Sequence, residues 1–322
     1  MSKFEPSQLP NLAGQVAIVT GGHSGLFVLL PILQNMLTKS SGPGTTTELL
    51  RHGATVYIAS RSRDKGEAAI KLLKLEQPTA DVHLLICDLG DLESVKSAAA
   101  EFIQQEHRLH ILVNNAGVMC TPYSETKQGF ETQFQTNYLS HYLLTRQLLP
   151  ILMSTAETSP KGMVRIVNVS SDGHAKLAPK EGILFVDKCR AKDVSTWTRY
   201  GMSKLANILH TKELARRYGA SGVIAVCLHP GTVKTNLSQG PRNSTPLYRL
   251  IQPLVELGAP GPERGAWPLL WCAASSTLTV EDNGSYFLPI GKKTPASKSG
   301  EDKVLAGRLW DWTEKELANA GV

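Results

Sequence analysis

The sequence has little that would place it in a membrane or outside the cell. Its longest apolar run, 26–33, contains a proline and is far shorter than the ~18 residues of a membrane-spanning helix. The opening stretch, MSKFEPSQLPNLAG, is polar and interrupted by prolines, whereas a secretory signal has a continuous apolar core. We therefore expect a cytoplasmic protein without an integral membrane segment.

Blocks of like charge are also missing. The 322 residues carry a formal net charge of +6, but lysines and arginines alternate with acids and no five like charges stand together. A nucleic-acid-binding protein usually concentrates its basic residues in one patch or stripe. We expect no nucleic-acid partner, and interpret the charge as a solvated surface that also suits a polyanionic cofactor.

Cysteine is scarce and lacks any recognisable spacing. The five cysteines form no CxxC pair, and an odd number without such pairs argues against both a disulfide framework and a zinc site. We expect buried free thiols in a reducing compartment, and no metal. The five are Cys87, Cys120, Cys189, Cys227 and Cys272.

What the sequence does contain is a regular alternation of strand-like and helix-like segments. Most of the apolar runs are continuous, as in strands buried on both faces of a parallel sheet. Such alternation predicts a single-domain α/β fold over residues 1–322, a doubly wound (Rossmann) parallel sheet of about seven strands with helices on both faces. The predicted strands are Val16–Val19, Thr55–Ala59, His83–Cys87, Ile111–Val113, Val164–Val169, Val223–Leu228 and Tyr286–Leu288.

Ligands of such sheets bind at the carboxyl ends of the strands, and the first strand is followed by TGGHSG. Glycines let the backbone approach a pyrophosphate, and the following helix N-terminus supplies amide donors. The candidate phosphate-binding residues are Gly21, Ser24, Gly25 and Leu26. By itself this signal is weak, because glycine turns after strands are common.

The next three strand ends carry polar residues too. Arg61 follows the second strand, where an acid would hold the ribose of NAD and an arginine can pair with the 2′-phosphate of NADP. A plain surface arginine is an equal alternative. Asp88 ends the third strand and NNAG, 114–117, ends the fourth. Both are also compatible with simple turn chemistry.

A stronger arrangement follows the fifth strand. That strand ends in Ser170 and Ser171, and YGMSK then places Tyr200 and Lys204 four residues apart on one helix face. A free tyrosine has a pKa near 10. A neighbouring ammonium group favours the phenolate and would lower that pKa towards neutrality, so that the hydroxyl could exchange a proton with a substrate.

These motifs together resemble the short-chain dehydrogenase/reductase family over about Leu12 to Leu317. TGGHSG, NNAG, TNYLSHYLLT, VNVSS, YGMSK and HPGTVKTN match the family's motifs in order. YIASRS, the long interval between Ser171 and Tyr200, and SKLANILHTKELARR are similar to the retinol-dehydrogenase-like and WW-domain-oxidoreductase-like subgroup.

The resemblance implies a role for each matching position. Tyr200 would be the general acid/base, Lys204 would assist it and hold the nicotinamide ribose, and Ser171 would bind the substrate oxygen. Asn137 would complete the tetrad by holding a water. NADP(H) would be the cofactor, contacted by Gly21, Ser24, Gly25, Leu26, Arg61, Asp88, Asn115, Ala116, Gly117, Tyr200, Lys204, Pro230, Gly231, Val233 and Thr235.

The sequence indicates the class of substrate less clearly than the type of reaction. About 237–262 resembles a substrate lid and holds PLYRLIQPLVELG, which favours a bulky apolar alcohol or carbonyl compound. Packing of those apolar residues onto the core is an equal alternative. A homodimer is a further expectation.

One segment, about 27–43, does not fit the first β-α unit. Arg61 lies 36 residues after Gly25, whereas the ribose-reading residue usually follows its loop by about 20. The family also has a glycine where Phe27 stands. We expect an atypical insertion that is foreign to the fold, such as a short intron translated in frame; the alternative is a genuine insertion that makes a membrane or partner contact. An interrupted loop also keeps open a nucleotide-binding or catalytically impaired scaffold.

Overall fold

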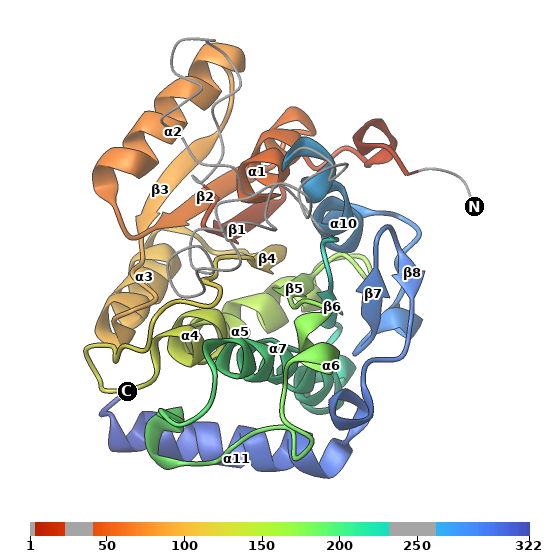
Figure 1. Ribbon diagram of the computed structural model, residues 1–322. Coiled ribbons are helices and arrows are strands. Elements are labelled where there is room, and N and C mark those ends of the chain that lie inside the picture. The colour runs from red at the N-terminus through yellow and green to blue at the C-terminus, as the bar shows by residue number, and fades with distance from the viewer. Residues whose placement is uncertain (1–3, 23–40, 232–261) are drawn as a thin grey trace, which may run out of the picture.

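The computed structural model describes residues 4–22, 41–231 and 262–322, which form an α/β fold around one eight-stranded sheet (Figure 1). The strand order is β3-β2-β1-β4-β5-β6-β7-β8. The strands are β1 (Val16–Thr20), β2 (Thr55–Ser60), β3 (Val82–Ile86), β4 (Ile111–Asn114), β5 (Arg165–Val169), β6 (Ile224–Leu228), β7 (Tyr286–Leu288) and β8 (Lys292–Lys293).

The seven predicted strands are confirmed, and the eighth is a correction. Strands β1 to β7 are parallel, whereas β8 pairs antiparallel with β7 through Phe287 and Lys293. The pair Lys292–Lys293 has no apolar pattern because β8 lies at an exposed edge, where lysine is common.

The sheet is doubly wound about β1. Ala17 pairs with Val56 of β2 on one side and with Ile111 of β4 on the other. The chain therefore leaves β1 and β4 towards opposite halves of the sheet, and the crevice outside their carboxyl ends is where such folds bind ligands.

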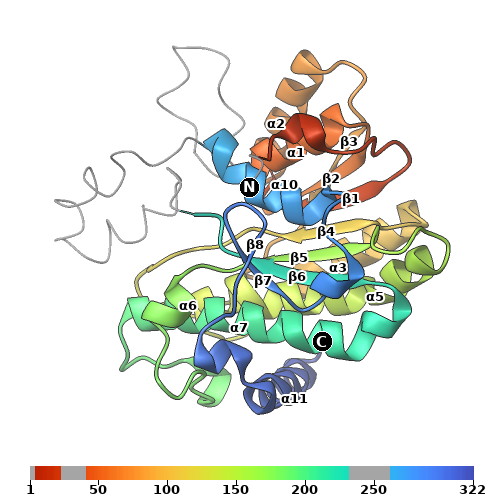
Figure 2. The same ribbon diagram turned by 90° about the vertical axis from the view of Figure 1, so that its right-hand side faces the viewer.

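Helices cover both faces of the sheet (Figure 2). Buried side chains of α1, α2 and α10 pack on one face. Those of α3, α5 and α7 pack on the other, with α11 beneath α7. The helices are α1 (Ser41–Arg51), α2 (Arg63–Glu76), α3 (Leu92–Gln105), α4 (Thr132–Phe134), the π-helix η2 (Gln135–Leu139), α5 (Ser140–Glu157), α6 (Gly173–Lys176), α7 (Thr196–Tyr218), α10 (Pro262–Ala274) and α11 (Lys303–Asn319). Short 3-10 turns are η1 (Pro6–Gln8), η3 (Asp187–Cys189), η4 (Gly219–Ser221), η6 (Val280–Asp282) and η7 (Lys298–Glu301). Within the described residues, no helix is both long and apolar enough to span a membrane.

The two segments predicted as an insertion and a lid fall largely outside the described residues. Residues 41–43 of the insertion form the start of α1, and 27–40 are not described. The later part of α1 packs against the sheet, where Leu49 and Leu50 are buried in the apolar core. Of the lid, only Pro262 is described, at the start of α10.

All five cysteines are buried, and none forms a disulfide, as the sequence predicts. Each side chain lies in the apolar core. Cys87 is the most exposed of the five, and only 4% of it is exposed. Burial raises the pKa of all five thiols, because a thiolate is poorly solvated there.

Candidate active site

Helix α7 carries two of the predicted catalytic residues, Tyr200 and Lys204, on its buried face. Ser195 caps the helix by accepting a hydrogen bond from the Thr198 amide, which fixes where the helix begins. Tyr200 and Lys204 then follow in its first turns and are only 5% and 4% exposed. One turn of helix therefore presents a hydroxyl and an ammonium group to the carboxyl end of β5.

Ser171, just after β5, meets the tyrosine. A Cβ added at Gly173 would lie 3.5 Å from Ser171 Oγ and 3.2 Å from Tyr200 Cε1, so the serine hydroxyl lies close to the tyrosine ring. It also accepts from the Gly173 amide (3.1 Å) and donates to Asp172 Oδ1 (3.1 Å). The preceding Ser170 ties β5 to α7 by donating to the Lys204 carbonyl (2.7 Å). The predicted serine and tyrosine are thus brought together by one strand end and one helix.

The pKa of Tyr200 shifts opposite to the predicted direction. Burial raises it above its ordinary value of 10, and the neighbouring Ser171 hydroxyl opposes that shift only in part. Desolvation penalises the phenolate, and the neighbouring Cys120 and Asp172 side chains add to the rise. The Tyr200 hydroxyl is consequently protonated at neutral pH, the form that can donate a proton.

Lys204 faces the strand rather than the phenol oxygen. Its Nζ donates to the Val169 carbonyl (3.0 Å) and lies 5.8 Å from the centre of the Tyr200 ring. Burial lowers the pKa of Lys204 to about 8. The Val169 carbonyl also accepts from Asn207 Nδ2 (3.1 Å), so two side chains of α7 converge on the end of β5.

Asn137 lies in the π-helix η2, beside α7. Its Nδ2 donates to the Ser203 hydroxyl (2.9 Å), and Ser203 donates to the Tyr200 carbonyl (2.7 Å). A Cβ added at Gly117 would lie 2.9 Å from Asn137 Oδ1 and 3.5 Å from Lys204 Nζ, so a side chain there would displace Asn137. π-helical turns are rare and often occur at functional sites.

His141, which the sequence analysis missed, and Thr20, which it placed only in the TGGHSG loop, join this turn to the first strand. His141 Nδ1 contacts the Asn137 carbonyl (3.0 Å), and its Nε2 contacts the Thr20 hydroxyl at the end of β1 (2.9 Å). The same hydroxyl accepts from the Asn115 and Ala116 amides (2.9 and 3.0 Å). Two features of the sequence could have indicated this connection: Thr20 is a polar residue at the end of a strand, and His141 follows Asn137 by one helical turn.

The predicted adenosine-binding positions lie at neighbouring strand ends. Gly21 has a φ of +67°, and a Cβ there would approach Ala116 to 3.2 Å. Asp88 is half-buried and accepts from the Gly90 amide (2.9 Å). Arg61 is exposed directly after β2, with no ion-pair partner among the described residues.

Two of the predicted nicotinamide-pocket residues, Pro230 and Gly231, follow β6. Gly231 has a φ of +86°, a conformation that favours glycine. The remaining predicted site residues, Ser24, Gly25, Leu26, Val233 and Thr235, lie outside the described residues. The described part of the chain holds no group of three or more acidic, histidine or cysteine side chains that could bind a metal ion.

The fold and the meeting of Ser171, Tyr200 and Lys204 at one sheet edge define an oxidoreductase of the Rossmann class. The short chain dehydrogenase family profile matches residues 38–181. A short-chain dehydrogenase/reductase of Aspergillus calidoustus, drtF, is 46% identical over 328 residues and covers 98% of both chains. Retinol dehydrogenase 11 of Mus musculus is 37% identical over 300 residues, 93% of this chain and 85% of that one.

Solved structures agree with the sequence relatives. An uncharacterized protein from Mycobacterium paratuberculosis has a TM-score of 0.70 and 30% identity, covering 98% of this chain and 97% of that one. An NADPH-bound carbonyl reductase from chicken fatty liver shares the fold with a TM-score of 0.62 at 21% identity, covering 88% and 100%. The chain belongs to the short-chain dehydrogenase/reductase family of enzymes, in its retinol-dehydrogenase-like subgroup.

Proposed function

We propose that this enzyme is an NADP(H)-dependent oxidoreductase that transfers hydride between nicotinamide and a carbonyl or secondary alcohol of an apolar small molecule. The observation that carries the proposal is the closeness of Ser171 Oγ to the Tyr200 ring, at 3.5 Å and 3.2 Å from one Cβ position at Gly173, beside the buried Lys204. These groups would act on one substrate oxygen, which both hydroxyls could reach.

The residues at the strand ends fit a dinucleotide. Arg61 is an exposed guanidinium at the end of β2, suited to a 2′-phosphate. Next to Pro230, His229 Nδ1 is buried without a hydrogen-bond partner among the described residues, so a polar ligand group would satisfy it. The chicken carbonyl reductase that shares this fold is a complex with NADPH.

When bound, the nicotinamide would supply or accept the hydride at the substrate carbon. In the reducing direction, Ser171 would donate a hydrogen bond to the carbonyl oxygen and stabilise the charge that develops there. Tyr200 would transfer its proton to that oxygen. The Lys204 ammonium would stabilise the resulting phenolate until a proton returns, and Asn137 would hold a water on that return path. Oxidation reverses each step.

A second candidate is a nucleotide-binding scaffold without turnover. The specific observation in its favour is in the sequence, where Phe27 stands at the position of the third glycine of the family's phosphate loop and Arg61 lies 36 residues after Gly25. In the ordinary arrangement a helix N-terminus directly after that loop binds the pyrophosphate. The apolar residues in 237–262 support an apolar substrate for the first candidate.

The test is cofactor binding followed by turnover. Purified protein is titrated with NADPH and with NADH, and then assayed on all-trans-retinal and a panel of aliphatic and aromatic aldehydes and ketones. We expect tighter binding of NADPH and reduction of at least one apolar carbonyl. Binding without turnover on any carbonyl would support the scaffold, and absence of binding would contradict both candidates.

The 2′-phosphate contact has its own matched pair of variants. Arg61→Asp should remove the preference for NADPH over NADH, because it replaces a charge-assisted hydrogen bond by repulsion. Arg63→Asp is the control, since Arg63 is similarly exposed but pairs with Glu67 on α2 (3.5 Å). Equal preferences in the parent and Arg61→Asp proteins would refute the assignment.

A further inference from the structure

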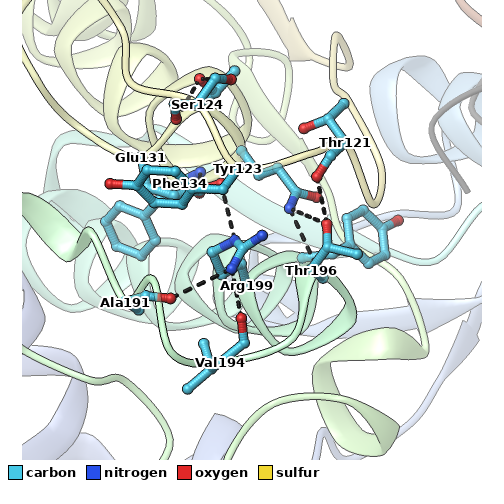
Figure 3. Close-up of polar contacts among 12 residues, drawn as sticks. Thr121, Tyr123, Ser124, Glu131, Phe134, Ala191, Val194, Thr196 and Arg199 are labelled. Atoms are coloured by element: carbon cyan, nitrogen blue, oxygen red, sulfur yellow. Dashed lines mark hydrogen bonds and ion pairs between the residues drawn. The ribbon is translucent and has the colours of Figure 1, made fainter. Parts of the chain in front are cut away.

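A buried ion pair lies just outside the site, between Glu131 and Arg199 (Figure 3). Their side chains are 0% and 6% exposed, and Glu131 Oε1 lies 3.4 Å from Arg199 Nε. Neither of these two atoms has a regular hydrogen bond within the described residues. Burial raises the pKa of the Glu131 carboxyl, and the guanidinium opposes that shift.

Each partner belongs to a helical segment that carries a residue of the proposed tetrad. Arg199 immediately precedes Tyr200 in α7. Glu131 caps α4 by accepting from the Phe134 amide (2.7 Å), and α4 runs directly into the π-helix that holds Asn137. The pair therefore connects the two helical segments that carry the proposed acid/base and its relay residue.

Arg199 also fixes the chain that leads into α7. Its guanidinium donates to the carbonyls of Ala191 (3.4 Å) and Val194 (2.5 Å), as Figure 3 shows. Ala191 has a φ of +25°, a conformation that a residue with a side chain keeps only where its surroundings hold it. The face of the Tyr123 ring lies 5.3 Å from the guanidinium carbon and closes the other side.

A second bridge runs parallel to the ion pair. Gln133 Nε2 donates to the Thr196 hydroxyl (3.0 Å) and carbonyl (3.1 Å) in the first turn of α7. Gln133 Oε1 accepts from the Cys120 amide (2.7 Å). With the contact from Asn137 to Ser203, the two segments are joined at three places. The ion pair is the charged member of that series.

We propose that Glu131 and Arg199 are positioning residues, whose ion pair sets the placement of Tyr200 relative to Asn137. This inference rests on the proposed function for its catalytic consequence. A buried ion pair adds little to stability compared with apolar side chains of the same volume, but it specifies one geometry. Because a misplacement of about 1 Å can lower a rate by about 10²-fold, such specification matters at a proton-transferring hydroxyl.

The kinetic test uses the full-length protein and the best carbonyl from the panel. Glu131→Gln keeps an oxygen to cap α4 but loses the charge, and we expect kcat to fall about 10- to 100-fold. The dissociation constant for NADPH should stay unchanged, because the pair lies away from the strand ends of the adenosine half. The kcat of Arg199→Lys should lie between those of the parent and of Arg199→Gln, since lysine keeps the charge but loses the Nη1 hydrogen bonds to the Ala191 and Val194 carbonyls.

Glu314→Gln is the matched control. It breaks another ion pair between helices, Arg146 to Glu314 (2.9 Å), which joins α5 to α11 away from Tyr200. We expect a lower thermal midpoint and an unchanged kcat. If Glu131→Gln and Arg199→Gln behave like this control, the positioning role is overturned. Should Arg199→Gln fail to fold, the double variant Glu131→Gln/Arg199→Gln, which leaves no unpaired charge, takes its place.

A structural measurement separates this inference from the proposed function. If the parent reduces no carbonyl, the proposed function fails, but crystal structures of the parent and of Glu131→Gln still compare the Tyr200 hydroxyl with Asn137. We expect their separation to change by about 1 Å, the scale at which rates respond. An unchanged separation would overturn the positioning role whether or not the parent is active.

Discussion

Replacing Lys204 with methionine should make the protein more stable while abolishing its activity. Burial lowers the pKa of Lys204 from 10.5 to about 8. At about 1.4 kcal/mol for each pKa unit, the buried ammonium destabilises the fold by about 3 kcal/mol at pH 7. Methionine has a similar shape and no charge to desolvate.

The lost hydrogen bond offsets part of that gain. Lys204 donates to the Val169 carbonyl, a contact worth about 1 kcal/mol. That carbonyl keeps Asn207 as a donor at 3.1 Å and is not left unpaired. We therefore expect Lys204→Met to raise the free energy of unfolding at pH 7 by about 2 kcal/mol.

The pH dependence gives the sign of the effect independently. Below pH 8 the lysine is protonated in both states, so the full penalty is present. Between pH 8 and 10.5 the unfolded chain binds the proton and the folded chain does not, so this group makes the parent more stable as pH rises. The advantage of Lys204→Met should shrink over that range.

Urea unfolding at pH 7 and pH 9.5 measures both quantities. Lys212→Met is the control, because Lys212 lies in the same helix but pairs with Glu301 (2.7 Å) at the surface, and its loss should not stabilise. A Lys204→Met protein less stable than the parent at pH 7, or an advantage that does not change with pH, would refute the reasoning.

Three further predictions concern the site. Tyr200→Phe should lower kcat by about 10²–10⁴-fold with the fold intact, because it removes the proposed proton donor; parent-like turnover with circular dichroism unchanged would exclude that role. Gly117→Ala should lower kcat about 10- to 100-fold, since its Cβ would meet Asn137 Oδ1 at 2.9 Å; steady-state kinetics with an unaffected kcat would show that Asn137 need not stay in place. Deleting 27–43 joins Leu26 to Gly44 and returns the third glycine of the family pattern, so calorimetry should find tighter NADPH binding. Weaker binding by the shortened chain would mean that the segment belongs to the site.

The elements with a continuous apolar pattern could be predicted from the sequence. Strands such as β1 and β6 were found because burial on both faces leaves a nearly continuous apolar run. Ser171 and Tyr200 meet, as the motif spacing indicates, because one ends a strand and the other lies in the next long helix.

Other features have no local signal. A π-turn at Asn137 has nearly the same apolar spacing as the α-helix around it, so the sequence does not distinguish them. Glu131 and Arg199 look like surface charges in the sequence, since only the tertiary fold buries them together. The pKa of Tyr200 was predicted in the wrong direction because helical spacing gives the distance to a lysine but not the loss of water.

The five buried thiols can be used to measure local unfolding of the protein. A maleimide or iodoacetamide reagent needs a deprotonated thiol that is in contact with solvent. At all five cysteines the fold raises the thiol pKa and buries the sulfur, so neither requirement is met. Labelling should therefore be slow in native buffer and proceed only as segments open. The five side chains lie on different elements, Cys87 after β3, Cys189 at η3 and Cys272 in α10 among them. Mass spectrometry of the labelled peptides would then record, cysteine by cysteine, which region opens first.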